Sequence, residues 1–315
     1  MGGSSYSRDV YSSSSSSSWG TSSTSVTKLS NNTLDGSMKS NGKVIKSTSK
    51  NPIVIVLDVT GSNIDFARLV YDKMPMFYGQ IEEKQYLKDF DIAILAIGDV
   101  GMGDSYPLQI GDFAKGIEID SWLERLVLEG HGGGNRRESY ELAAHYLNEC
   151  CEFEKDAEPI VFFIGDEAAY DEVKKKEADE YGIPCSQNHD PFPKLIEKFD
   201  NNVFMLLNKY CGRDFESDIT NFWQRKLPSE HTIKIKEEKS IVDLMLGIIA
   251  LLNKRRLAAI ETDMLLRGQT HARLTNVRDS LLELSRSTEL AAVPNINTDV
   301  MSLKKTNKAN KGKRI

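Results

Sequence analysis

The sequence predicts an α/β fold: a doubly wound, mostly parallel central sheet flanked by helices on both faces. Two observations support this prediction. From residue 51 onward, short and continuous apolar runs rich in Val and Ile recur along the chain. Between them lie longer segments whose apolar residues repeat at three- and four-residue spacings. Strands that alternate with helices over residues 51–255 form right-handed βαβ units, and these units place helices on both faces of the sheet.

The predicted strands follow from the apolar runs. Residues 53–57 read Ile-Val-Ile-Val-Leu after Pro52, and a run without polar alternation is typical of a strand buried on both faces. The same reasoning predicts central strands at 91–97, 160–164 and 202–207, an edge strand at 107–113 and a further strand at 231–236.

The predicted helices follow from periodicity. In residues 64–80, apolar side chains recur at helical spacing from Phe66 to Phe77. Further helices are expected at 120–128, 135–151, 167–181, 217–226 and 240–253. The helix at 240–253 is apolar on most of its circumference, so we expect it to pack against the sheet.

The chain is expected to have four parts. Residues 1–50 are dominated by Ser and cannot bury enough apolar area to offset their ordering entropy, which predicts a disordered arm. The folded domain is expected at 51–255. Residues 256–287 predict a helical extension, broken near Gly268, that packs on the domain or pairs with another chain. Residues 288–315 predict a basic, disordered tail.

Charge is distributed unevenly along the chain. The net charge is -6, but residues 1–50 carry +4 and the last fifteen residues carry +6, so residues 51–300 carry -16. The basic ends either contact a polyanion such as nucleic acid or act as solubilising tails. The acidic body argues against nucleic-acid binding by the folded part.

Compartment and membrane signals are sparse. The longest apolar stretch, residues 241–252, is too short to span a membrane and contains Asp243. The four cysteines include no Cys-x-x-Cys pair and are too few for a disulfide framework. We therefore expect a soluble, cytoplasmic protein without membrane contact.

Oxygen-bearing side chains follow two of the predicted strands. Asp58, Thr60 and Ser62 alternate directly after the first strand, and Asp166 follows the strand at 160–164. A glycine-rich loop at 130–138 opens a predicted helix between them. Ligands of such sheets bind outside the carboxyl ends of the strands. A carboxylate pair and two hydroxyls are hard oxygen donors that suit Mg²⁺ or Mn²⁺.

These motifs resemble those of von Willebrand factor A (VWA) domains. The segments Asp-x-Thr-Gly-Ser, Gly-Gly-Gly before a helix and Gly-Asp after a strand correspond to the metal-ion-dependent adhesion site of that family, and the resemblance covers roughly residues 50–255 in element order. It implies that Thr60 and Ser62 bind the metal directly, and that Asp58 and Asp166 act directly or through water.

The sequence also departs from that family. The loop Thr is absent: Asn135 stands where the nearest subset of the family has Asp, Arg137 where it has Pro, and Glu138 matches its Glu. Asn63 replaces Met, and Glu167-Ala168-Ala169 replaces Ala-Pro-Pro. The fourth ligand is therefore open, with Asn135 as the first candidate and Glu138 as the alternative.

The resemblance implies a non-catalytic protein–protein interaction module. In such a module, an Asp or Glu of a partner protein completes the coordination of the metal. One alternative is a metal-independent scaffold that oligomerises through its C-terminal helices; the oligomeric state itself is open. A Mg²⁺-dependent hydrolase is the weaker alternative, because the general acid of one such class would stand at position 60, where this chain has Thr.

Overall fold

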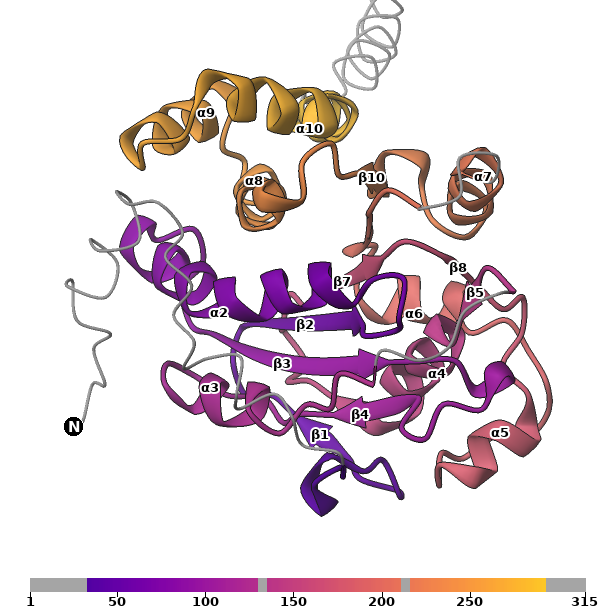
Figure 1. Ribbon diagram of the computed structural model, residues 1–315. Helices are drawn as coiled ribbons and strands as arrows, with labels where there is room; N and C mark the ends of the chain where they lie inside the picture. Colours follow the sequence, from indigo (N-terminus) through magenta and orange to yellow (C-terminus); the bar gives the residue numbers. More distant parts are fainter. Residues whose placement is uncertain (1–32, 130–134, 211–215, 293–315) are drawn as a thin grey trace, which may run out of the picture.

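The computed structural model describes residues 33–129, 135–210 and 216–292 (Figure 1). Most of the predicted Ser-rich arm, residues 1–32, lies outside the described residues. The same holds for residues 130–134 of the glycine-rich loop and for the basic tail from residue 293 onward.

The centre of the fold is a six-stranded sheet, which confirms the predicted fold class. Its strand order is β10-β9-β7-β2-β3-β4, and every neighbouring pair is parallel except β3 and β4. In that order the strands are Thr232–Lys234, Val203–Leu207, Ile160–Gly165, Asn51–Asp58, Phe90–Ile97 and Leu108–Ile110. All residues of the four central strands are buried, as their continuous apolar runs predict.

Helices cover both faces of this sheet. Ile53, Ile55 and Leu57 of β2 pack into one apolar core, and Val54 and Val56 pack into another. The first core is closed by α2 (Ile64–Lys84), α3 (Glu118–Leu123) and α8 (Ile241–Leu252). The second is closed by α4 (Tyr140–Cys150), α5 (Lys175–Glu180), α6 (Phe192–Lys198) and α7 (Glu216–Lys226). Single 3₁₀ turns lie at Gly36–Met38 (η1), Val100–Met102 (η2), Ser229–His231 (η4) and Glu238–Ser240 (η5).

Part of the segment before the sheet belongs to the fold. The sequence predicts disorder up to residue 50, but residues 33–50 lie against the domain, with Leu34, Met38 and Ile45 buried. Strand β1 (Ile45–Lys46) pairs in parallel with β6 (Cys151–Glu152). These few apolar side chains are enough to anchor a mainly polar segment. The amino-acid composition averaged over residues 1–50 does not indicate their role.

Three predicted helices begin or end elsewhere. Instead of one helix over 167–181, the chain forms β8 (Ala168–Ala169) and then the short α5. The helix expected from residue 135 starts at Tyr140, because β5 (Arg137–Glu138) pairs in parallel with β8. Tertiary pairing overrides helix propensity at both places. The helix expected to end at residue 128 ends at Leu123. Helix α6 was not predicted; it is short and begins next to Pro191.

The C-terminal extension packs on the domain. Helices α9 (Leu257–Leu266) and α10 (His271–Ala292) lie on the side of α8 that faces away from the sheet (Figure 1). They are separated at Gly268, whose φ of +75° favours glycine. Gly247 of α8 allows close approach, since a Cβ there would lie 2.4 Å from Cδ1 of Leu281. The first residues of the predicted tail, 288–292, belong to α10.

In the part of the chain that the structure describes, no helix is both long and apolar enough to cross a membrane.

Leu281 is expected to hold α10 on the domain. Its side chain is fully buried against α8, so Leu281→Ala removes apolar contacts and leaves a cavity. We expect a loss of about 2–5 kcal/mol in the free energy of unfolding, measured by urea denaturation. The neighbouring Leu282 is 36% exposed, and Leu282→Ala is the matched control with a change under about 1 kcal/mol. Equal effects of the two variants would contradict the packing role.

Candidate metal centre

Two loops meet at the carboxyl edge of the sheet. Strands β2 and β7 are neighbours, with Leu57 opposite Ile164, so Asp58 and Gly165 end their strands side by side. The chain after β2 carries Thr60 and Ser62, and the chain after β7 carries Asp166. The topology therefore brings the predicted ligands from both loops to one place.

Asp58 is fully buried and holds the first loop in position. Its Oδ1 accepts hydrogen bonds from the Thr60 backbone N–H (2.9 Å) and from the Thr60 hydroxyl (2.6 Å). Its Oδ2 accepts one from the Tyr140 hydroxyl (3.1 Å). The Asn63 side chain donates to the Asp58 carbonyl oxygen (3.0 Å). The turn is thus closed by its own side chains.

Ser62 connects the two loops. Its hydroxyl donates to Oδ1 of Asp166 at 3.2 Å, so the hydroxyl points from the β2 loop toward the β7 loop. Together with the Thr60–Asp58 bond, this contact places four of the predicted ligands in one cluster: Asp58, Thr60, Ser62 and Asp166.

A glycine is required at the end of β7. A Cβ at Gly165 would lie 1.8 Å from the Tyr140 hydroxyl and 2.8 Å from Oδ2 of Asp58. No real side chain fits at such distances, so the absence of a side chain lets Tyr140 reach Asp58. Tyr140 is a residue of this site that the sequence analysis missed.

Two glutamates extend the cluster. Glu138 of β5 and Glu167 after β7 are buried. Among the described residues, neither carboxylate oxygen of Glu138 has a hydrogen-bond partner, and Oε2 of Glu167 has none either. A buried carboxylate without a partner is costly, so these oxygens call for a proton or a cation.

The buried carboxylates also perturb one another. Burial raises the pKa of Asp58, and burial together with the Asp58 charge raises the pKa of Asp166. Burial followed by the charges of Asp58 and Glu167 raises the pKa of Glu138 far above its ordinary range. Burial and the Asp58 charge raise the pKa of Glu167 to about 7. All four shifts express the same excess of buried negative charge.

Asn135, the first candidate for the fourth ligand, belongs to a different network. Its amide nitrogen donates to Oδ2 of Asp99 (2.8 Å) and contacts the Tyr170 hydroxyl (2.7 Å). Its amide oxygen accepts the Arg137 backbone N–H at 3.0 Å. The polar atoms of Asn135 are thus engaged in bracing the loop before β5.

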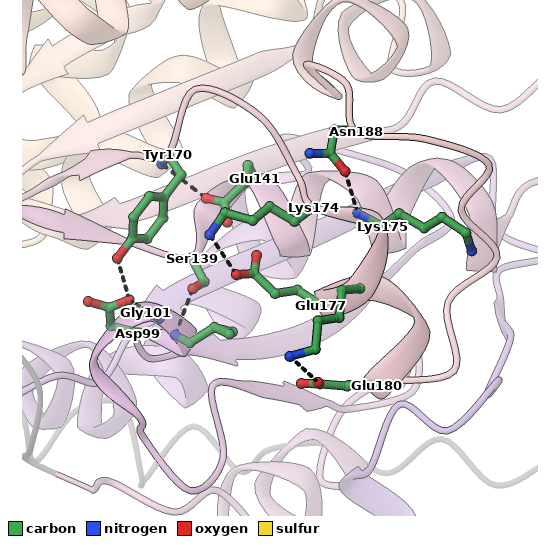
Figure 2. A network of polar contacts seen from close by, with 12 residues as sticks. Asp99, Gly101, Ser139, Glu141, Tyr170, Lys174, Lys175, Glu177, Glu180 and Asn188 are labelled. Carbon is green, nitrogen blue, oxygen red and sulfur yellow. Dashed lines mark hydrogen bonds and ion pairs between the residues drawn. The ribbon is translucent and has the colours of Figure 1, made fainter.

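Asp99 and Tyr170 contact each other as well as Asn135, and Figure 2 shows the Tyr170 hydroxyl directed at the Asp99 carboxylate. The Tyr170 hydroxyl donates to Asp99 at 2.8 Å, and the Gly101 N–H donates to the same carboxylate at 2.7 Å. Buried Glu141 accepts the Tyr170 backbone N–H at 3.1 Å. The sequence analysis missed these residues; the only signal for Asp99 is its place after Ile97-Gly98 at the end of β3.

The donor set fits a hard divalent cation. Two carboxylates and two hydroxyls converge, and further carboxylate oxygens lie buried without partners. Oxygen donors of this kind suit Mg²⁺. Among the described residues, no group of three or more His, Cys, Asp or Glu side chains is arranged to hold a metal ion. The candidate cluster has a different composition, because half of its four donors are hydroxyls.

Comparisons with known proteins find distant structural likenesses. No family model and no curated protein sequence matches the chain. The open conformation of the pilus adhesin SpaC from Lactobacillus rhamnosus GG is 10% identical at a TM-score of 0.43, over 67% of this chain and 31% of that one. Proximal thread matrix protein 1 from the mussel byssus is 10% identical at a TM-score of 0.40, over 66% of this chain and 49% of that one.

A second structure of the mussel protein is described with a zinc-occupied MIDAS motif. It is 9% identical to this chain at a TM-score of 0.42, over 67% of this chain and 49% of that one. The chain spans less than half the length of each of these proteins.

Glu141 provides a prediction on pH dependence. Burial raises its pKa from the ordinary 4.5 to about 8, so the folded state favours its protonated form. The stabilisation from that protonation is complete below about pH 4.5 and is lost as the pH rises through about 8. In Glu141→Gln, whose amide does not titrate, the free energy of unfolding should fall less over this range. Urea denaturation at several pH values measures the difference.

The control for this prediction is Glu172→Gln. Glu172 is exposed and lies on the loop between β8 and α5. Its variant should retain the pH dependence of the wild type, and a Glu141→Gln curve parallel to the wild-type curve would refute the assignment.

Proposed function

We propose that the protein is a non-catalytic, cation-dependent protein interaction module. In this proposal Asp58, Thr60, Ser62 and Asp166 hold Mg²⁺ at the carboxyl edge of the sheet, and an Asp or Glu of a partner protein completes the coordination. The supporting observation is the Ser62–Asp166 contact of 3.2 Å, which joins two separate crossover loops through oxygen atoms.

The number of donors leaves room for a further ligand. The two carboxylates among the four proposed donors balance the charge of the cation and the two hydroxyls add none, so a carboxylate of the partner would bind at an open coordination position. Mg²⁺ prefers six oxygen ligands, and four protein donors leave positions for that carboxylate and for water. Mn²⁺ has the same ligand preference and is the second choice.

We further propose that Glu138, rather than Asn135, supports the metal site through a water molecule bound to the cation, since among the described residues no third acidic side chain is arranged to bind a metal directly with Asp58 and Asp166. Both carboxylate oxygens of Glu138 are buried without partners in the described structure, and the charge of Asp58 acts on it. The amide oxygen of Asn135 already accepts the Arg137 N–H. Asn135 then serves to position the loop that carries Glu138.

One class of Mg²⁺-dependent hydrolases needs a general acid at position 60, and the cluster does not supply one there. In the described residues, position 60 is a Thr whose hydroxyl donates to Asp58, so no carboxylic acid stands there to protonate a leaving group. Tyr140, the other titratable group on Asp58, is buried, and its pKa lies well above its ordinary value because of that burial and the Asp58 charge.

One observation favours the scaffold alternative. Leu265 and Leu266 at the end of α9 are 46% and 73% exposed, although α9 and α10 pack on α8. Exposed adjacent leucines are compatible with self-association through the C-terminal helices. Size-exclusion chromatography with light scattering, with and without EDTA, separates this alternative from cation-dependent partner binding.

A cytoplasmic location is part of the proposal. Cys150, Cys151 and Cys185 are free thiols in the described structure, as expected of a protein in a reducing compartment. Contact of the basic tails with a polyanion remains a prediction, because most of both tails lies outside the described residues.

Ser62→Ala tests the proposed metal centre. Removing the hydroxyl takes away one donor and the contact to Asp166, so the Mg²⁺ affinity should fall by at least about tenfold in a calorimetric titration. The metal should also raise the melting temperature of the wild type more than that of the variant, since only a bound ligand stabilises the folded state. Ser121→Ala, at an exposed position on α3, is the control. Equal Mg²⁺ affinities in wild type and Ser62→Ala would refute the site.

A second pair of variants separates Glu138 from Asn135. Glu138→Gln keeps the size of the side chain but replaces a carboxyl group with an amide that cannot lose a proton on cation binding, so the Mg²⁺ affinity should fall by about tenfold or more. Asn135→Ala should leave the Mg²⁺ affinity within a few-fold of the wild-type value, because in this proposal the Asn135 amide only positions the loop before β5. The opposite ranking of the two affinities would favour Asn135 as the ligand.

A further inference from the structure

A basic pocket lies next to the candidate metal centre. Its cavity of about 220 Å³ lies between the segment that leads into β5, strand β8 and helix α7. Arg136, Arg137 and Arg225 line it together with Asp218, so three guanidinium groups face one carboxylate. This excess of positive charge is unusual on a body that carries -16 between residues 51 and 300.

The guanidinium groups are held by an aromatic ring. The Cζ atoms of Arg137 and Arg225 lie 5.5 Å and 6.0 Å from the centroid of Phe222. Arg137 also forms an ion pair with Asp171 at 3.3 Å. Arg225 is exposed and forms no ion pair with any residue that the structure describes. A planar guanidinium ordered beside a ring is suited to bidentate binding of a carboxylate.

The pocket and the acidic cluster share two short strands. Arg137 lines the pocket and the next residue, Glu138, is buried in the acidic cluster, as expected for side chains that alternate along a strand. Ala168 lines the pocket two residues after Asp166. Consecutive Cα atoms are about 3.8 Å apart, so the backbone positions that carry the two sites are close neighbours, although the side chains of Arg137 and Glu138 point to opposite sides of β5.

We infer that the pocket binds a second acidic side chain of the partner. This inference rests on the proposed function: one Asp or Glu of a peptide segment completes the cation's coordination, and a second acid enters the pocket between Arg225 and Arg137. An extended peptide advances about 3.3 Å per residue, so acids two or three residues apart are separated by about 7–10 Å, a separation that we take as suited to two sites on neighbouring backbone positions. The partner is therefore an acidic peptide segment with this spacing.

The experiment is a selection of random peptides displayed on phage against the full chain in Mg²⁺. The wild type should enrich peptides with two acids two or three residues apart. Selection on Arg225→Glu should retain the first acid and lose the second. Selection on Ser62→Ala, or with EDTA, should lose the acid that binds the cation.

The outcomes separate this inference from the proposed function. If wild type and Arg225→Glu enrich the same peptides with a single acid, the inference that the pocket binds a second acid is refuted, whereas the proposed metal centre is not. Enrichment of the acid pair that is unchanged in Ser62→Ala and in EDTA supports the pocket and overturns the proposed function. Failure to enrich acidic residues at all overturns both.

The selected peptide is then synthesised and its affinity measured by calorimetry. Arg225→Glu should weaken binding by about tenfold or more, because it replaces an attractive charge with a repulsive one. Arg286→Glu on α10 makes the same change of charge at an exposed position outside the pocket and should change the affinity by less than about twofold. Equal losses in both variants would show a long-range charge effect and would overturn the pocket.

Discussion

The excess of buried negative charge at the carboxyl edge of the sheet is the constraint on which the site depends. Four carboxyl groups are buried there: those of Asp58, Glu138, Asp166 and Glu167. Burial raises the pKa of each, and the charge of Asp58 raises the pKa of the other three further. Moving carboxylates out of water is unfavourable unless they are paired, protonated or bound to a cation. Gathering four carboxyl groups at one buried edge is therefore unfavourable while they are charged, and in the function that we propose a divalent cation would reduce their repulsion and stabilise this edge.

The surrounding structure keeps these groups close together. Parallel pairing of β2 with β7 sets the two loops side by side, and Gly165 leaves the space through which Tyr140 reaches Asp58. Pairing of β5 with β8 brings Glu138 to the same edge, while Asn135 fixes the entry to β5 through Asp99 and Tyr170. The geometry of the cluster is thus set by backbone pairing and by hydrogen bonds between protein groups.

The fold was predictable because its signals are local. Continuous apolar runs mark the buried strands whatever lies beside them, and the Asp58–Ser62 turn sits directly after one of these runs. The misplaced helix at 167–181 has a different origin. Ala168–Ala169 pairs with Arg137–Glu138, about thirty residues earlier in the chain. The pattern of residues within either segment does not indicate this long-range pairing. The same pairing brings Glu138 to the edge of the sheet, where it is buried, and so its burial could not be deduced from spacing alone.

The opposite charges on β5 follow from the geometry of a strand. Successive side chains of a strand face opposite sides, so Arg137 and Glu138 are directed to different surroundings although they are adjacent in sequence. Arg137 stays half-exposed over Phe222, whereas Glu138 is buried near Asp58. Nearby, the positive charge of Arg136 acts against the rise in the pKa of Glu167. The electrostatic potential therefore changes steeply across the paired strands β5 and β8. In the function that we propose, an anionic partner would be attracted first to the exposed guanidinium groups and would approach the inner carboxyl groups only with the cation between them, so the cation would be required for binding.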